Sequence, residues 1–346
     1  MSKTNWKKGG VCLLSLAFLL TACKGGSDKP TTADTAAKTP GGSVTVAGTD
    51  TEPQEEFTDA APTSAQISDY KDDPQVEELA RQVEEKHGID IVYGEDVRRN
   101  FGNEEEDLRA TAFTSAEGIK TAIRSVDEAF SAFPKGLTSQ LADEKRGTLK
   151  VYLLGAVGQG DNAPESGAYP AFTDNEDPEL FLAIDISPDG FINVPTVSHE
   201  FTHVIDFRMH EMGKFDDEGW NKLNPEGFSY VENYETYATG EFANKYSYTE
   251  YHYTPRKLTQ PPEDVYFVYN YGTVSALEDR ATLLEPLIIY RMWGHDTIAP
   301  GMYEFPHIQA KTEYFLKAIE AAFDLAPEDV EIWKNAYEKL ANKTEP

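Results

Sequence analysis

Apolar residues recur at three- and four-residue spacing over much of the chain, which predicts amphipathic helices, while shorter apolar runs predict strands. One helix is predicted to begin near Pro74 and to end at Gly88, and the alternating residues 89–93 follow as a strand. Two apolar runs, 148–154 and 179–186, are predicted to lie in one sheet, with a loop rich in Gly, Asp and Pro between them. Further helices are predicted over residues 119–133, 193–213, 274–293, 308–323 and 327–340.

The amino terminus has a different pattern. Lysines precede the apolar residues 11–20, a run that is too short to span a bilayer and is typical of a signal peptide. The next residues, Leu20-Thr21-Ala22-Cys23, resemble the lipobox of bacterial lipoproteins, which implies cleavage before Cys23 and acylation of the new terminus. We therefore interpret residues 1–22 as a lipoprotein signal peptide and Cys23 as a lipid anchor. The alternative is an ordinary secretory signal with an incidental cysteine.

Residues 24–69 are mostly Thr, Ala, Gly, Pro, Ser, Asp and Glu, with almost no large apolar side chains. Such a segment cannot bury enough surface to offset the loss of chain entropy on folding. We assign residues 23–72 to a lipid-anchored, disordered acidic tether and residues 73–346 to one folded domain. No internal repeat and no second linker divides that domain.

The chain is strongly acidic, with a net charge of −29. Removal of residues 1–22, which carry three lysines and no carboxylate, would bring this charge to −32. No basic patch is visible in the sequence, so nucleic acid is excluded as an expected partner. Of the two cysteines, Cys12 lies in the signal peptide and Cys23 at the anchor, so the folded domain has no disulfide.

The residues His199-Glu200-Phe201-Thr202-His203 form an HExxH motif inside a predicted helix. Positions four apart on a helix lie one turn apart on the same face, so both imidazoles can bind one zinc ion. A zinc ion lowers the pKa of a bound water, and Glu200 is placed to accept its proton as general base. The alternative is a chance match in an acidic helix.

A catalytic zinc site needs a third protein ligand. A histidine six residues after the second histidine is excluded, because Met209 stands there, and His210 would point away from the metal on the same helix. A carboxylate from a second segment is the remaining common solution. The candidates are Glu232, Glu235, Glu241 and Glu278.

Tyr271, Glu278 and Ala281 keep a register that resembles the third-ligand segment of gluzincin metallopeptidases of the anthrax lethal factor type. The wider pattern is similar to the zinc-binding metallopeptidase lipoproteins of bacteria and includes Trp220, Asn224, Pro225, Phe228, Tyr230 and residues 278–281. The resemblance implies an α+β, zincin-like (gluzincin) domain, with a short twisted sheet, an active-site helix and C-terminal helices. It further implies His199, His203 and Glu278 as zinc ligands, Glu200 as general base and Tyr271 as stabiliser of the oxyanion.

The chain departs from this pattern at Thr282, where lethal factor has a glutamate. Our hypothesis is that Asp279 instead orients a zinc-bound histidine, since such imidazoles usually need a partner for the second nitrogen. Glu278 also has an alternative reading, because residues 275–278 fit a capping box in which the glutamate returns to the helix start. Tyr271, likewise, could simply be a packed aromatic residue.

The predicted function is that of a zinc-dependent metallopeptidase, held in the cell envelope by its lipid anchor, which acts on peptide or protein substrates outside the cytoplasm. One alternative is a surface binding or adhesion lipoprotein with a structural or vestigial zinc site, which would be favoured by a fourth ligand such as His210 or His252. Another is an amidase acting on cell-wall peptides.

The acidic residues 174–177 are interpreted as a solvated loop rather than a calcium site. His295 and His307 are interpreted as surface or structural residues, and His295 is also a candidate hydrogen-bond donor to the transition state.

Overall fold

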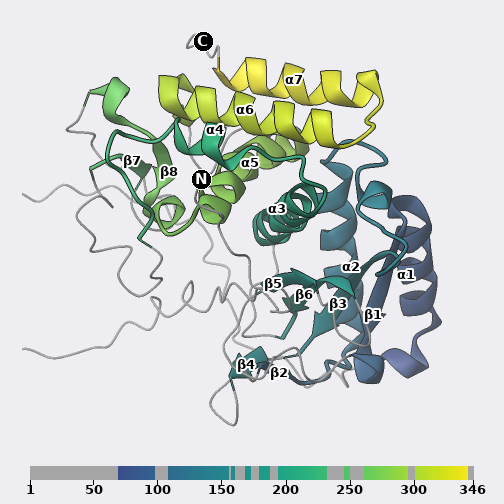
Figure 1. The fold of residues 1–346 in the computed structure, drawn as a ribbon. Helices are drawn as coiled ribbons and strands as arrows, with labels where there is room; N and C mark the ends of the chain where they lie inside the picture. The colour runs from purple at the N-terminus through teal and green to yellow at the C-terminus, as the bar shows by residue number, and fades with distance from the viewer. Residues whose placement is uncertain are drawn as a thin grey trace, which may run out of the picture. The chain divides into compact units, whose positions relative to one another are not determined.

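The two apolar runs that were predicted as strands lie side by side in the centre of one sheet (Figure 1). Strands β3 (Leu149–Leu154) and β6 (Leu180–Asp185) pair in parallel, with Val151 opposite Leu182. Strand β1 (Ile89–Tyr93) pairs with β3, also in parallel. All residues of β6 are buried, as expected for parallel strands that are covered on both faces.

The fourth strand of this sheet lies in the segment that the sequence pattern indicated to be a loop. Strand β5 (Ala168–Phe172) pairs antiparallel with β6 and completes the order β1-β3-β6-β5. It contains Pro170, which has no backbone N–H and is therefore typical of edge strands. Strand β4 (Val157–Gln159), in the same segment, pairs antiparallel with β2 (Leu108–Ala110).

The computed structural model describes residues 69–97, 108–155, 157–159, 168–172, 179–187, 194–231, 245–249, 261–294 and 301–341, and all of these belong to one compact unit. The predicted signal peptide, the anchor at Cys23, the acidic residues 174–177, His252 and His295 lie outside the described residues. Within the described ranges, no helix is long and apolar enough to cross a membrane. A 3-10 helix (Tyr70–Asp72) forms within the residues that the sequence analysis assigned to the tether.

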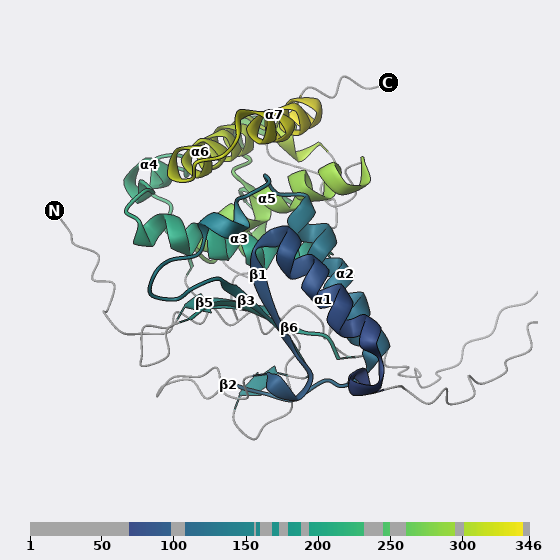
Figure 2. The ribbon, with the colours of Figure 1, turned by 90° about the vertical axis from the view of Figure 1, so that its right-hand side faces the viewer.

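Helices α1 (Pro74–His87) and α2 (Ala116–Ser131) lie side by side next to the sheet (Figure 2). Both begin where the sequence provides a cap. The Asp73 side chain accepts a hydrogen bond from the Gln75 amide, and the Ser115 side chain accepts one from the Gly118 amide. Helix α1 ends at Gly88, whose φ of 67° is a left-handed conformation that glycine adopts without strain.

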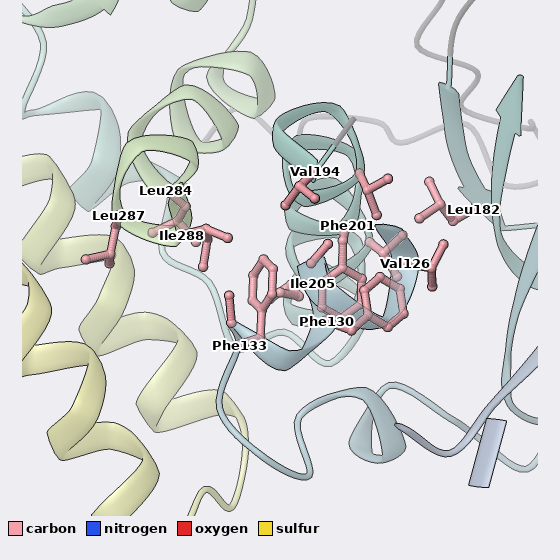
Figure 3. Close-up of a cluster of buried hydrophobic side chains, with 14 of the residues drawn as sticks. Val126, Phe130, Phe133, Leu182, Val194, Phe201, Ile205, Leu284, Leu287 and Ile288 are labelled. Carbon is pink, nitrogen blue, oxygen red and sulfur yellow. The ribbon is translucent and has the colours of Figure 1, made fainter. Parts of the chain in front are cut away.

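Helix α3 (Val194–Glu211) lies between the sheet and helix α5 (Ala276–Trp293), and its apolar side chains fill the core between them (Figure 3). Phe201 stacks on Phe130 of α2, with ring centroids 4.2 Å apart, and meets Phe133 edge to face at 4.7 Å. The core therefore holds α3 from several sides and fixes how its polar residues are turned.

Two long helices, α6 (Pro306–Ala322) and α7 (Pro327–Ala341), form a further layer beyond α5, on the side away from the sheet (Figures 1 and 2). Both agree with the predicted ranges. The remaining elements are α4 (Asp217–Asn221), the parallel pair β7 (Ser247–Thr249) and β8 (Phe267–Tyr269), and 3-10 helices at Gly94–Asp96, Thr138–Gln140, Pro262–Asp264, Asn270–Thr273 and Met302–Glu304. The structure is thus mixed α and β, as predicted.

Candidate metal centre

The HExxH residues lie on α3, in a part of the helix that is buried on every face. His203 and Glu200 have no exposed surface, and His199 retains only 5% of its surface. Buried polar groups are costly unless they are paired or bind a cation. The burial of all three side chains therefore requires partners for their polar atoms.

The partner comes from the first turn of α5. Ser275 caps this helix, because its hydroxyl accepts a hydrogen bond from the Glu278 amide at 3.2 Å. The Glu278 carboxylate does not return to the cap, as a full capping box would require, but extends to α3. Its Oε2 lies 3.0 Å from His199 Nε2 and 3.3 Å from His203 Nε2. The structure therefore brings together the predicted ligands His199, His203 and Glu278.

The spacing of these donor atoms suits a metal ion. One nitrogen from each histidine and one carboxylate oxygen of Glu278 all lie within 4.8 Å of one another. In a tetrahedral zinc site with bonds of about 2.0–2.1 Å, the ligand atoms lie about 3.3 Å apart. The two imidazole rings lie 4.9 Å apart between centroids, with their planes 84° apart.

Unpartnered polar atoms mark the same place. Neither carboxylate oxygen of Glu200 and neither ring nitrogen of His203 has a hydrogen-bond partner among the described residues. The 3.3 Å contact between His203 and Glu278 is an ion-pair distance without hydrogen-bond geometry. Buried groups of this kind are rare in folded proteins, and a metal ion with a bound water would satisfy them. The residues present therefore fit a metal.

The charges around the site favour a cation. Burial raises the pKa of Glu200 well above its ordinary value. Burial acts in the same direction on Glu278, but His203 and His199 outweigh it and hold the pKa of that carboxyl below its usual range. Burial would lower the pKa of His199, whereas Glu278 and Glu285 raise it well above the ordinary value. The carboxylates thus create a buried site that positive charge stabilises, either as a protonated histidine or as a metal ion.

Tyr271 also lies at the site. It belongs to the 3-10 helix Asn270–Thr273 that leads into α5, and its side chain is buried. The Tyr271 hydroxyl donates a hydrogen bond to Glu278 Oε1 at 3.1 Å, and its ring centroid is 6.2 Å from that of His199. It is therefore more than a packed aromatic side chain, because its polar end touches a candidate ligand.

Asp279 does not orient a histidine, which corrects the sequence hypothesis. It follows Glu278 by one position, about 100° around the helix, and so faces α6 rather than α3. Its Oδ2 accepts hydrogen bonds from Tyr230 at 2.9 Å and from Lys311 of α6 at 2.7 Å. Trp220 in turn donates to the Tyr230 hydroxyl. Trp220 and Tyr230 thus help to hold the first turn of α5 in place.

The carboxylate beside His199 is Glu285, which the sequence analysis missed. Its Oε2 lies 3.5 Å from His199 Nδ1. The one sequence signal for Glu285 is that it follows Glu278 by seven residues. Residues seven apart lie on the same face of a helix, two turns from each other. Recognising it required knowing that α5 packs along α3, since a glutamate within an apolar stretch has other interpretations.

His210 is excluded as a fourth ligand by its contacts. Its Nε2 lies 3.0 Å from Asp217, and its Nδ1 lies 2.8 Å from the carbonyl oxygen of Asp206. Both nitrogens are therefore engaged. His210 follows His203 by seven residues, so it lies about two turns farther along α3 and on nearly the same face, and its distance along the helix, not its direction, separates it from the site. His307 stacks on Tyr266, with ring centroids 3.7 Å apart. Within the described ranges, the only group of side chains placed to hold a metal is His199, His203 and Glu278, which leaves a tetrahedral ion one open position.

The surroundings of His210 predict a stability that depends on pH. Burial would lower its pKa, but hydrogen bonds to Asp206 and Asp217 outweigh both burial and the nearby Arg280, and raise it from 6.5 to about 10. Because the folded-state pKa is raised, the stabilisation is fully present below pH 6.5 and is lost as pH rises to about 10. We expect His210→Gln to cost about 2 kcal/mol at pH 6.5, as for hydrogen bonds to charged groups, and little at pH 10. Urea unfolding of both metal-free proteins at several pH values tests this, and a constant difference would contradict it.

Comparison with known proteins finds no matching family model, no matching curated protein and no matching solved structure.

Proposed function

We propose that this chain is a zinc-dependent hydrolase with a zincin-like domain, and that it cleaves peptide bonds. The observation that carries the proposal is the buried convergence of His199, His203 and Glu278 beside the unpartnered carboxylate of Glu200. Two neutral imidazoles and one carboxylate, with a fourth position open, are typical of catalytic rather than structural zinc sites. A bound zinc ion would act as a Lewis acid and would lower the pKa of a water molecule.

Glu200 is proposed as the general base. It lies next to His199 on α3, and its two oxygens have no hydrogen-bond partner among the described residues. It is therefore free to take a proton from water and to return it to the leaving nitrogen. A structural glutamate in the same place would be expected to have a partner within the fold.

Tyr271 is proposed as a hydrogen-bond donor to the carbonyl oxygen of the substrate. Its hydroxyl touches Glu278, so it lies at the edge of the same site. Developing negative charge on an oxygen is best stabilised by donors that are already in place and shielded from water. The burial of Tyr271 meets that condition.

A peptide substrate is supported by the edge of the sheet. Among the described strands, β5 pairs only with β6 and leaves its other edge without a strand, and β5 is in contact with α3. An extended peptide can add to such an edge through backbone hydrogen bonds.

We further propose that the lipid anchor at Cys23 holds the enzyme outside the cytoplasm, in the cell envelope, as the sequence of residues 1–23 suggests.

Metal removal tests the proposed function. Elemental analysis of the purified protein is expected to find about one zinc per chain, and a chelator is expected to stop the cleavage of a peptide library. Zinc at 1,000 times its dissociation constant should stabilise the fold by about 4 kcal/mol relative to the metal-free state. The variant Glu278→Gln is the control, because it should lose most of that zinc-dependent stabilisation. Unchanged thermal stability with zinc, and cleavage that continues in chelator, would contradict the proposal.

A further inference from the structure

We infer that Glu285 is the positioning residue that holds His199 in the ring orientation and tautomer needed to bind the metal. This inference rests on the metal site proposed above and adds to it a residue outside both sequence motifs. It assigns to Glu285 the role that the sequence analysis gave to Asp279.

The geometry around His199 carries the inference. Its two ring nitrogens face two different carboxylates, Glu278 Oε2 at 3.0 Å from Nε2 and Glu285 Oε2 at 3.5 Å from Nδ1. Nε2 is the nitrogen that converges with His203 and Glu278, so it is the one available to a metal. Nδ1 then faces the Glu285 carboxylate at an ion-pair distance, and we infer that it donates its proton there when the metal is bound.

Helix α5 supplies both carboxylates from one face. Glu278 and Glu285 are seven residues apart, and seven residues turn a helix through about 700°, within about 20° of two full turns. Because α5 packs along α3, two carboxylates on this face reach opposite sides of one imidazole. The position four residues after Glu278 cannot serve, because it holds Thr282, whose hydroxyl donates to the Asp279 carbonyl oxygen.

Burial gives a second reason. Glu285 keeps only 5% of its surface and lies between the fully buried Leu284 and Leu287 in sequence. A buried carboxylate is strongly unfavourable unless it is paired. An ordinary packing position on this helix would hold another aliphatic residue, so the presence of a glutamate beside His199 indicates a polar role.

The chemical consequence concerns the tautomer of His199. An acceptor at Nδ1 keeps the proton there and leaves the Nε2 lone pair directed at the metal site. It also prevents the ring from rotating about its Cβ–Cγ bond. Loss of such a partner typically lowers metal affinity by about 10- to 100-fold.

Zinc affinity of the full chain, measured by competition with a chelating indicator, tests the inference in the variant Glu285→Leu, which removes the acceptor and keeps a buried side chain of similar size. The matched control is Glu179→Leu, which makes the same change at a buried carboxylate that hydrogen-bonds Lys150 and Tyr152 of β3. We expect about 10- to 100-fold weaker zinc binding in Glu285→Leu and an unchanged affinity in Glu179→Leu. Equal affinities of Glu285→Leu and the unaltered protein would overturn the inference.

A spectroscopic measurement on the unaltered protein avoids any effect of a variant on folding. In the zinc-loaded protein labelled with nitrogen-15, long-range proton–nitrogen spectra should show His199 protonated at Nδ1, with slow exchange of that proton with solvent. The Glu285→Leu variant, which has no acceptor at this place, should exchange this proton faster. Metal binding through Nδ1 of His199 would refute the role of Glu285, whereas a failure of the unaltered protein to bind zinc would refute the proposed function itself.

Discussion

The variant Glu200→Gln is expected to lose about 10²- to 10⁴-fold in the rate of peptide cleavage, the contribution typical of a general base, while it still binds zinc. Glu200 is not among the three convergent donors, so its replacement leaves the metal site intact. The amide of glutamine has nearly the same shape as the carboxylate but cannot accept a proton from water. The loss should therefore fall on turnover rather than on metal content.

The fold of this variant should be at least as stable as that of the unaltered protein. Glu200 is buried without a hydrogen-bond partner among the described residues, and burial raises its pKa, so its charge destabilises the fold. Glu211→Gln is the matched control, because it makes the same substitution at the end of α3, where Glu211 pairs with Arg146. Turnover, zinc content and thermal unfolding would be measured for all three proteins. Full turnover by zinc-loaded Glu200→Gln would defeat the assignment.

The local part of the site was predictable from sequence because it depends on one helix. His199, Glu200 and His203 need only helical spacing to share a face, and the apolar residues around them predict that helix. The role of Glu278 was harder to predict from the sequence, since Ser275 and Glu278 also fit a capping box. The structure combines both readings, because the serine caps the helix and the glutamate side chain reaches the histidines.

The rest of the site depended on how helices pack, which spacing alone does not specify. Asp279 and Glu285 are both acidic residues on α5. The sequence analysis selected Asp279 as the partner of a histidine because it is next to Glu278. The turn of the helix directs Asp279 to α6 and Glu285 to α3. A sequence pattern gives the angle around a helix, but only the packed structure tells which neighbour lies at each angle.

The secondary structure shows the same difference: elements that depend on local sequence were predicted, and elements that depend on pairing with distant residues were not. Helices with strong caps and continuous apolar faces, such as α1 and α2, were predicted to within a few residues. Strand β5 was missed, because a short edge strand with a proline is held by its pairing with β6 and has little signal of its own. Residues 220–271 are rich in aromatic side chains but have no pattern from which an element was predicted, although β7 and β8 pair there.

The buried pair of Lys311 and Asp279 is predicted to be essential for the stability of the fold. Neither side chain has exposed surface, and Lys311 Nζ lies 2.7 Å from Asp279 Oδ2 and 3.8 Å from the centre of the Phe267 ring. Burial raises the pKa of Asp279 and lowers that of Lys311, so each charge depends on the other. We expect Lys311→Met to destabilise the metal-free protein by about 3–5 kcal/mol, because it leaves a buried carboxylate without its cation.

A double-mutant cycle separates this loss of charge pairing from loss of packing. The double variant Lys311→Met with Asp279→Asn removes both charges and keeps an acceptor for the Tyr230 hydroxyl, so it should recover a large part of the stability. Lys317→Met is the matched control on α6, where an exposed lysine lies 3.7 Å from Glu313, and it should cost less than about 1 kcal/mol. Urea unfolding in chelator is measured for the unaltered protein, Lys311→Met, Asp279→Asn, the double variant and the control, so that zinc does not contribute to any of the five stabilities. Should the double variant be as unstable as the sum of its single changes, the pair would contribute only packing, and the first turn of α5 would be held in place by other contacts.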